Sequence, residues 1–126
     1  MPLKLKHSLN RDYLKVEILG QRTPGNEVAE SKEIWKKVAN LLREQEQSRI
    51  LTIMKLKGRL PINSALQIAE SAEDLGWSHK YKMAVVSGSE AVLMNIRLSE
   101  MILNNLGYEI KLFGSTRMAR KWLLSN

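Results

Sequence analysis

The sequence predicts an α/β fold in which a mainly parallel sheet follows an N-terminal β-hairpin. Near the start, apolar and charged residues alternate in Leu3–Lys6 and again in Tyr13–Leu19, which is the period of half-buried strands. Further on, short apolar runs at Ile50–Met54, Met83–Val86 and Ile110–Phe113 are separated by segments whose apolar residues repeat with helical spacing. Strands that alternate with helices favour parallel pairing through right-handed crossovers.

Turn and helix signals place the first elements. Asn10–Asp12 has turn chemistry and closes the hairpin, and Gly20–Gly25 is expected to be a loop. Thr23-Pro24 is a plausible helix start. The helix that follows carries one apolar stripe, formed by Val28, Ile34, Trp35, Val38, Leu41 and Leu42.

The remaining helices are bounded by glycine, proline and serine. Gly58 and Pro61 separate the Ile50–Met54 strand from a second helix, which we expect to end at Gly76. A third helix follows the Met83–Val86 strand and is closed by Gly107. After the last strand, Ser115 or Thr116 caps a short final helix. We expect residues 1–126 to form a single domain.

The charge balance favours anionic partners. Twenty basic residues against thirteen acidic ones give a net charge of +7. However, the basic residues do not form one run, and the largest cluster is Lys55, Lys57 and Arg59. We therefore expect no specific nucleic-acid site, and only weak duplex binding with a dissociation constant no tighter than roughly 10⁻⁶ M.

The expected strands at the sheet edges are polar on one side. Leu14, Val16 and Ile18 share one face of their strand, whereas Lys15 and Glu17 share the other. A sheet covered by helices on both faces would be apolar on both. We therefore expect the helices to lie mainly on one face, which leaves the other face partly open.

An open sheet face is a candidate interface or ligand surface. We assign Ile50, Thr52 and Met54 to this open face, at its uncharged centre. The commonest way to bury such a patch is a two-fold contact, so we expect a homodimer. The alternative is that loops or the N-terminal strand cover the face.

Three segments resemble a known family. Tyr81–Val86, Tyr108–Phe113 and Arg117–Leu124 are similar to the SpoIIAA-like group of the STAS superfamily, which are small bacterial proteins. The closing segment shows that group's Ala-x-x-Trp-Leu signature as Ala119, Trp122 and Leu123. The resemblance implies a (β/α) superhelix and a non-catalytic regulatory or protein-interaction module.

The resemblance does not extend to the superfamily's phosphorylatable serine. That switch lies in an Asp-x-Ser-Gly-like element, and the equivalent stretch here, Lys55–Ser64, has neither the aspartate nor the Ser-Gly pair. Its nearest hydroxyl, Ser64, is expected to cap a helix. A role as an antagonist of anti-sigma factors is therefore in doubt.

One turn is a candidate anion site. Ser87, Gly88 and Ser89 connect a strand to a helix, where backbone amides can hold a phosphate or carboxylate, and Lys57 and Arg59 could add positive charge. A single glycine satisfies neither the Walker nor the dinucleotide-binding pattern, so a simple turn capped by serine is the competing interpretation.

No catalytic constellation is found in the sequence. His7 and His79 have no metal-ligand neighbours at helical or strand spacing, and no nucleophile elbow or cysteine is present. We therefore expect no enzyme activity, no metal and no cofactor. Because Met1–Lys6 lacks an apolar signal core and no apolar stretch is long enough for a membrane span, we expect a cytoplasmic protein.

A second function remains open. The protein could bind a small apolar or amphipathic anion, such as a lipid-like molecule. Methionine and tryptophan side chains could line an adaptable pocket for it, and the candidates are Met54, Met83, Met94, Met101 and Trp77.

Overall fold

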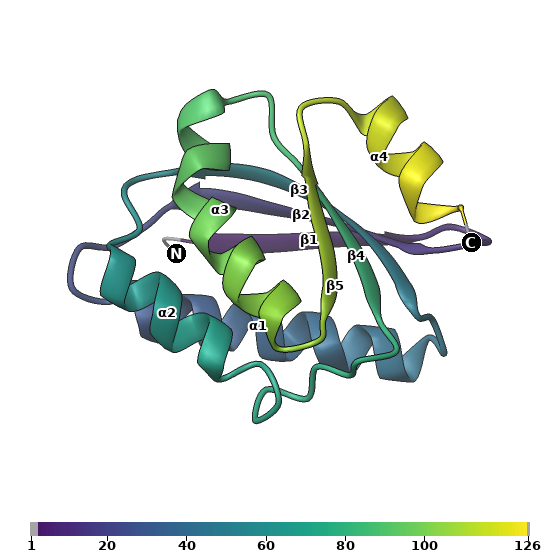
Figure 1. Cartoon of the computed structure of the whole chain (residues 1–126), viewed down its shortest axis with the longest axis horizontal. Helices are drawn as coiled ribbons and strands as arrows, with labels where there is room; N and C mark the ends of the chain where they lie inside the picture. Colours follow the sequence, from purple (N-terminus) through teal and green to yellow (C-terminus); the bar gives the residue numbers. More distant parts are fainter. Residues whose placement is uncertain (1–2, 126) are drawn as a thin grey trace.

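A five-stranded sheet organises residues 3–125, the part of the chain that the computed structural model describes (Figure 1). Its strands, in spatial as well as sequence order, are β1 (Leu3–Leu9), β2 (Leu14–Gln21), β3 (Arg49–Lys57), β4 (Lys82–Val86) and β5 (Glu109–Phe113). β1 pairs with β2 in antiparallel orientation, and all other neighbours are parallel. The predicted hairpin and mainly parallel sheet are confirmed.

Four helices connect or follow the parallel strands. They are α1 (Glu27–Glu44), α2 (Ile62–Glu70), α3 (Glu90–Asn105) and α4 (Thr116–Leu123). α1 begins later than predicted, because Thr23 forms a turn in which it accepts a hydrogen bond from the Asn26 amide at 2.9 Å. α2 ends earlier than predicted, at Glu70, and the chain reaches Gly76 through successive turns.

The sheet separates two layers of helix. α1, α2 and α3 cover one side, where Leu14, Val16 and Ile18 meet the helices in the larger hydrophobic core. α4 packs on the opposite side, in a smaller core that contains Leu51 and Ala84. Figure 1 shows α4 (yellow) on one side of the strands and α1 and α2 on the other. The expectation of helices mainly on one face is therefore correct, with α4 as the exception.

The assignment of Ile50, Thr52 and Met54 to an open face was wrong. All three lie on the helix-covered side, with exposed fractions of 0%, 0% and 5%. The parallel register is the reason, because Leu14 pairs with Ile50 and Val16 pairs with Thr52, which places them in phase with inward residues of β2. An uninterrupted apolar run does not reveal which of its two phases faces the helices.

A buried lysine holds α4 on its side of the sheet. The Lys82 ammonium donates hydrogen bonds to the carbonyl oxygens of Trp122 at 2.8 Å and Ser125 at 2.9 Å, at the C-terminal end of α4. It also lies 4.5 Å from the centre of the Trp122 ring. The charge thus adds a donor to carbonyl groups at the helix end, where the Trp122 oxygen also accepts from the Ser125 amide, and it complements the helix dipole.

Leu123 tests the packing of α4. Its side chain is fully buried, so Leu123→Ala should lower the free energy of unfolding by about 2–5 kcal/mol, through lost burial and a residual cavity. The matched control is Leu124→Ala, because Leu124 is 38% exposed. Urea denaturation measures both, and equal effects would mean that α4 packs in another orientation.

Candidate functional site

A cavity of about 90 Å³ lies between the larger core and helices α1, α2 and α3. Its lining is almost wholly apolar, with contributions from Met54, Met83 and Ala69 among others. The polar exceptions are Arg22 and the hydroxyl-bearing side chains of Ser31 and Ser99. An apolar pocket with few, well-placed polar groups is the usual form of a small-molecule site.

Arg22 is held at the rim of the cavity by the end of β3. Its amide donates a hydrogen bond to the Lys57 carbonyl at 2.9 Å, and its Nη1 donates one to the Gly58 carbonyl at 3.3 Å. Only 4% of the residue is exposed. Gly58 has a φ of +100°, and a Cβ there would lie 3.1 Å from the Cβ of Arg22, so a glycine is needed at this close approach.

One edge of the Arg22 guanidinium is free. Within residues 3–125, the buried Nε has no hydrogen-bond partner, and no bond from Nη2 to these residues is found. Nε and Nη2 together form the edge that can bind a carboxylate with two parallel hydrogen bonds. An unsatisfied buried donor is costly, which makes this edge a candidate for a ligand.

The charge of Arg22 is only partly compensated. Burial lowers the pKa of its guanidinium, and the negative charges of Glu27 and Glu30 act in the opposite direction. The Glu30 carboxylate is already engaged, since it accepts hydrogen bonds from the Thr23 amide at 3.0 Å and the Thr23 hydroxyl at 2.9 Å. The site therefore presents a cation without a carboxylate in direct contact.

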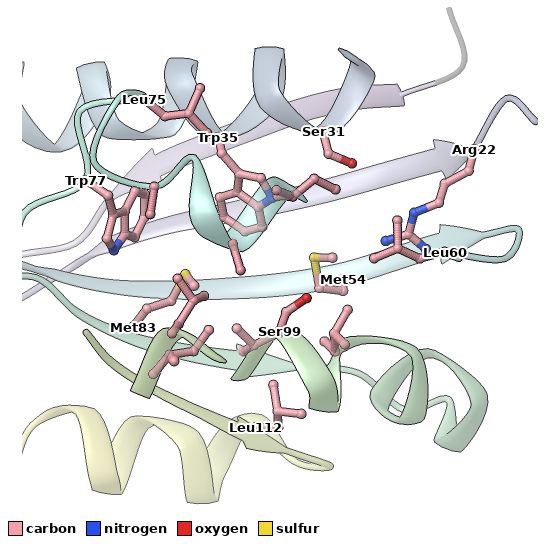
Figure 2. Close-up of a pocket in the computed structure, with 17 residues that line it drawn as sticks. Arg22, Ser31, Trp35, Met54, Leu60, Leu75, Trp77, Met83, Ser99 and Leu112 are labelled. Carbon is pink, nitrogen blue, oxygen red and sulfur yellow. The ribbon is translucent and has the colours of Figure 1, made fainter. Parts of the chain in front are cut away.

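The other end of the cavity is aromatic. Trp35 and Trp77 meet edge to face with ring centres 5.9 Å apart, and Trp77 meets Tyr81 in the same way at 5.5 Å. Figure 2 shows Arg22 at one end of the group of lining side chains and Trp77 at the other, with Met54 and Met83 between them. The site is thus amphipathic along its length.

The volume of the cavity limits its occupant. The cavity measures about 90 Å³. Pockets for drug-sized ligands are larger, about 300–1,000 Å³. Met54 and Met83 have flexible, polarizable side chains, so the lining can adapt around a small occupant.

The Ser87–Ser89 turn is a helix cap in this structure. The Ser89 hydroxyl accepts a hydrogen bond from the Val92 amide at 3.3 Å, and the Ser87 hydroxyl accepts one from the Ser89 amide at 3.1 Å. The donors near the start of α3 are thus partly satisfied by the chain's own side chains. Gly88 is exposed between them. The geometry is therefore that of a simple turn capped by serine, which was the competing interpretation of this segment.

The other residues predicted for the site are dispersed. Lys57 and Arg59 are exposed, and no ion pair or hydrogen bond among the described residues joins either of them to the Ser87–Ser89 turn. Ser64 lies inside α2 and does not cap it, because the cap position is Pro61.

The methionine prediction was correct for part of the set. Met54, Met83 and Trp77 line the cavity, as expected for an adaptable pocket. Met94 and Met101 do not, since they are 68% and 57% exposed on α3. Helical spacing alone did not separate the buried stripe of α3 from its outer one.

Arg22 was missed by the sequence analysis. A weak signal for it exists, because Arg22 continues the even-numbered phase of Leu14, Val16 and Ile18, which face the core. A charged residue at an inward position just past the end of a strand is a candidate for a buried functional cation.

Comparison with known proteins identifies the fold. No family model and no curated protein matches the chain. Among solved structures, it is similar to an uncharacterized protein of the DUF3478 family from Shewanella loihica PV-4, which has a SpoIIAA-like fold. The TM-score is 0.54 at 18% identity, over 96% of this chain and 93% of that one. The chain therefore has a SpoIIAA-like fold, as its resemblance to that group implied.

Two further findings describe residues 3–125. None of the helices there is both long enough and apolar enough to cross a membrane. In the same range, no group of three or more histidine, cysteine, aspartate or glutamate side chains is arranged to hold a metal ion.

We predict that Arg22 contributes little or nothing to the stability of the fold. Arg22→Met replaces the aliphatic stem of the side chain but removes a buried cation whose hydrogen-bonding capacity is largely unused. Replacing buried charge with an apolar group is often neutral or stabilising. We expect the free energy of unfolding in urea to stay within about 1 kcal/mol or to rise. A loss of about 3 kcal/mol or more would show that Arg22 is a structural ion-pair partner.

Proposed function

We propose that the protein binds a small amphipathic carboxylate in the cavity, without transforming it. The free edge of the Arg22 guanidinium would hold the carboxylate, and the apolar lining would hold the hydrocarbon chain. The observation that carries this proposal is a buried cation with an unpaired Nε at one end of an otherwise apolar cavity. The lipid-like ligand class was one of two functions expected from the sequence.

The lining supports binding more than catalysis. Arg22 is the one ionisable side chain among the described residues that line the cavity. Acid–base chemistry needs a proton donor or acceptor within reach of the substrate, and arginine stays protonated in proteins. Ser31 and Ser99 have hydroxyl groups in the lining, but no base among these lining residues could activate them.

The binding proposal predicts a dependence on chain length. Straight-chain carboxylates of two to ten carbons should bind with affinity that rises about fourfold per methylene, from about 0.8 kcal/mol for each buried CH₂, until the cavity is full. Titration calorimetry measures the affinity, and Trp35 and Trp77 supply a fluorescence signal because both line the cavity. The absence of binding at every chain length would refute the proposal.

Two variants separate the polar from the apolar contribution to ligand affinity. Arg22→Met should weaken carboxylate binding at least tenfold, while leaving a primary alcohol of the same length unaffected. Ala69→Leu should abolish binding of both, because Ala69 lines the cavity and is 2% exposed. Thermal denaturation checks that each variant is folded. Equal carboxylate affinity in Arg22→Met and the unmodified protein would exclude Arg22 from the site.

An interaction module is the second candidate function. What favours it is the outer surface of α3, where Met94 and Met101 stand two helical turns apart and are both largely exposed. Ile62 on the neighbouring helix α2 is 71% exposed. Apolar groups gathered on one surface mark contact sites more often than single exposed ones do. We propose that the expected homodimer uses this surface rather than Ile50, Thr52 and Met54.

The homodimer is tested by sedimentation equilibrium at micromolar concentration. We expect a dimer whose dissociation constant rises at least tenfold in Met101→Glu, because a charge would be buried in the contact. Met118→Glu is the matched control, since Met118 on α4 is 55% exposed against 57% for Met101. A monomer at all concentrations, or equal effects of the two variants, would contradict this interface.

The location of the protein in the cytoplasm stays a prediction.

A further inference from the structure

The basic residues, scattered in the sequence, gather on one side of the sheet. Cross-strand register places Lys6 opposite Glu17 and Ser8 opposite Lys15, on the side that faces away from α1. Strand alternation places the odd-numbered residues of β3 and β5 on the same side, where α4 packs. We call this side the basic face, and its ten basic residues are Lys4, Lys6, Lys15, Arg49, Lys55, Lys57, Lys111, Arg117, Arg120 and Lys121.

Acidic residues are nearly absent from the basic face. Among the described residues, only Glu17 and Glu109 lie on it. Ten of the thirteen acidic residues belong instead to the helical layer and its turns, and they are Glu27, Glu30, Glu33, Glu44, Glu46, Glu70, Glu73, Asp74, Glu90 and Glu100. The net charge of +7 is therefore polarised across the molecule.

Most charges of the basic face are not engaged. Eight of its ten basic residues are exposed, and Lys15 and Arg49 are half-buried. Within residues 3–125, the one ion pair that involves this face joins Lys55 to Glu17 at 3.8 Å. By contrast, the ammonium of Lys82 is occupied by carbonyl oxygens of the chain and is not part of the face.

We infer that the basic face binds the phosphate backbone of double-stranded nucleic acid, independently of base sequence. Lysine, the commoner residue on its strands, is a flexible point charge suited to phosphate rather than to a particular base edge. Single-stranded nucleic acid would need exposed aromatic rings for base stacking. On this side Tyr13 is buried, and Phe113 and Trp122 pack against each other with ring centres 5.7 Å apart.

An anionic membrane fits the arrangement less well. Surface binding to a bilayer needs apolar residues beside the basic ones, so that they enter the lipid together. Here Ile62, Leu66, Met94 and Met101 are exposed on α2 and α3, which lie on the opposite side of the sheet. On the side of the basic face, Met118 and Leu124 at α4 are exposed, at 55% and 38%, but no large exposed apolar residue has its side chain on the basic side of a strand.

This inference is independent of the cavity. Arg22 is buried on the helix-covered side and contributes nothing to the basic face. A duplex and a small carboxylate would therefore use different residues, and the Arg22→Met variant should bind nucleic acid as the unmodified protein does.

The test compares two variants with the same change in net charge. In the first, Lys4, Lys15, Arg117 and Lys121 on the basic face are replaced by glutamine. In the matched control, Lys32, Lys36, Lys80 and Arg97, none of which lies on that face, are replaced by glutamine. Both carry four fewer positive charges, and no side-chain hydrogen bond or ion pair of these eight residues is found within residues 3–125. Circular dichroism and thermal denaturation verify folding.

Fluorescence anisotropy with 20-base-pair duplexes of two unrelated sequences measures binding between 50 and 200 mM salt. We expect the two duplexes to bind within twofold of each other, and log affinity to fall against log salt with a slope of about −4 or steeper. The basic-face variant should lose at least tenfold in affinity and make the slope shallower by about 2 or more, because fewer phosphates are neutralised. The control variant and Arg22→Met should change affinity less than twofold.

Three outcomes would overturn the inference. Equal losses in the two charge variants would show a general effect of net charge. A strong preference for one duplex sequence would show base recognition in place of backbone recognition. Binding to vesicles of anionic phospholipid that depends on the basic face, without duplex binding at 50 mM salt, would assign this face to a membrane.

Discussion

The hydrogen-bonded register of the sheet fixes which side chains meet the helices and which face solvent. Because side chains alternate along each strand and neighbouring strands are held in phase, one choice of register decides which side every residue of five strands occupies. It places Val16, Thr52 and Val85 together under the helices. A slip of one residue would expose this set and bury lysines instead.

The two sides of the sheet consequently have different chemistry. On the helix-covered side, the inward phase of β2 continues past the strand to Arg22, which brings a cation to an apolar cavity. Burying the Arg22 cation without a direct counterion destabilises the fold. Packing alone does not explain this loss of stability, because an apolar residue would fill the same space. We therefore connect the cost with ligand binding, in line with the general conflict between stability and function at binding sites.

On the other side, α4 covers only part of the sheet. Lys82 holds the C-terminal end of this helix, while Ala119 and Leu123 fill the smaller core beneath it. Among residues 3–125, no helix covers the remaining surface toward β1 and β2 on this side, and that surface carries charge. The cavity and the basic face are thus separated by the sheet itself, so the two proposed activities can be altered independently.

The element order, the hairpin and the parallel sheet follow from the amino-acid sequence, because they depend on periodicity and turn chemistry within short segments. The SpoIIAA-like fold was implied separately, by the resemblance of three segments to that group. The sequence did not determine the phase of β3, since Ile50–Met54 is apolar at nearly every position and either phase could face the helices. Only the tertiary structure decided that Thr52 is buried, that Arg22 reaches a cavity, and that lysines from four strands and the cations of α4 share one face. Each of these features joins residues far apart in the chain, and their proximity arises from strand pairing rather than from any local pattern.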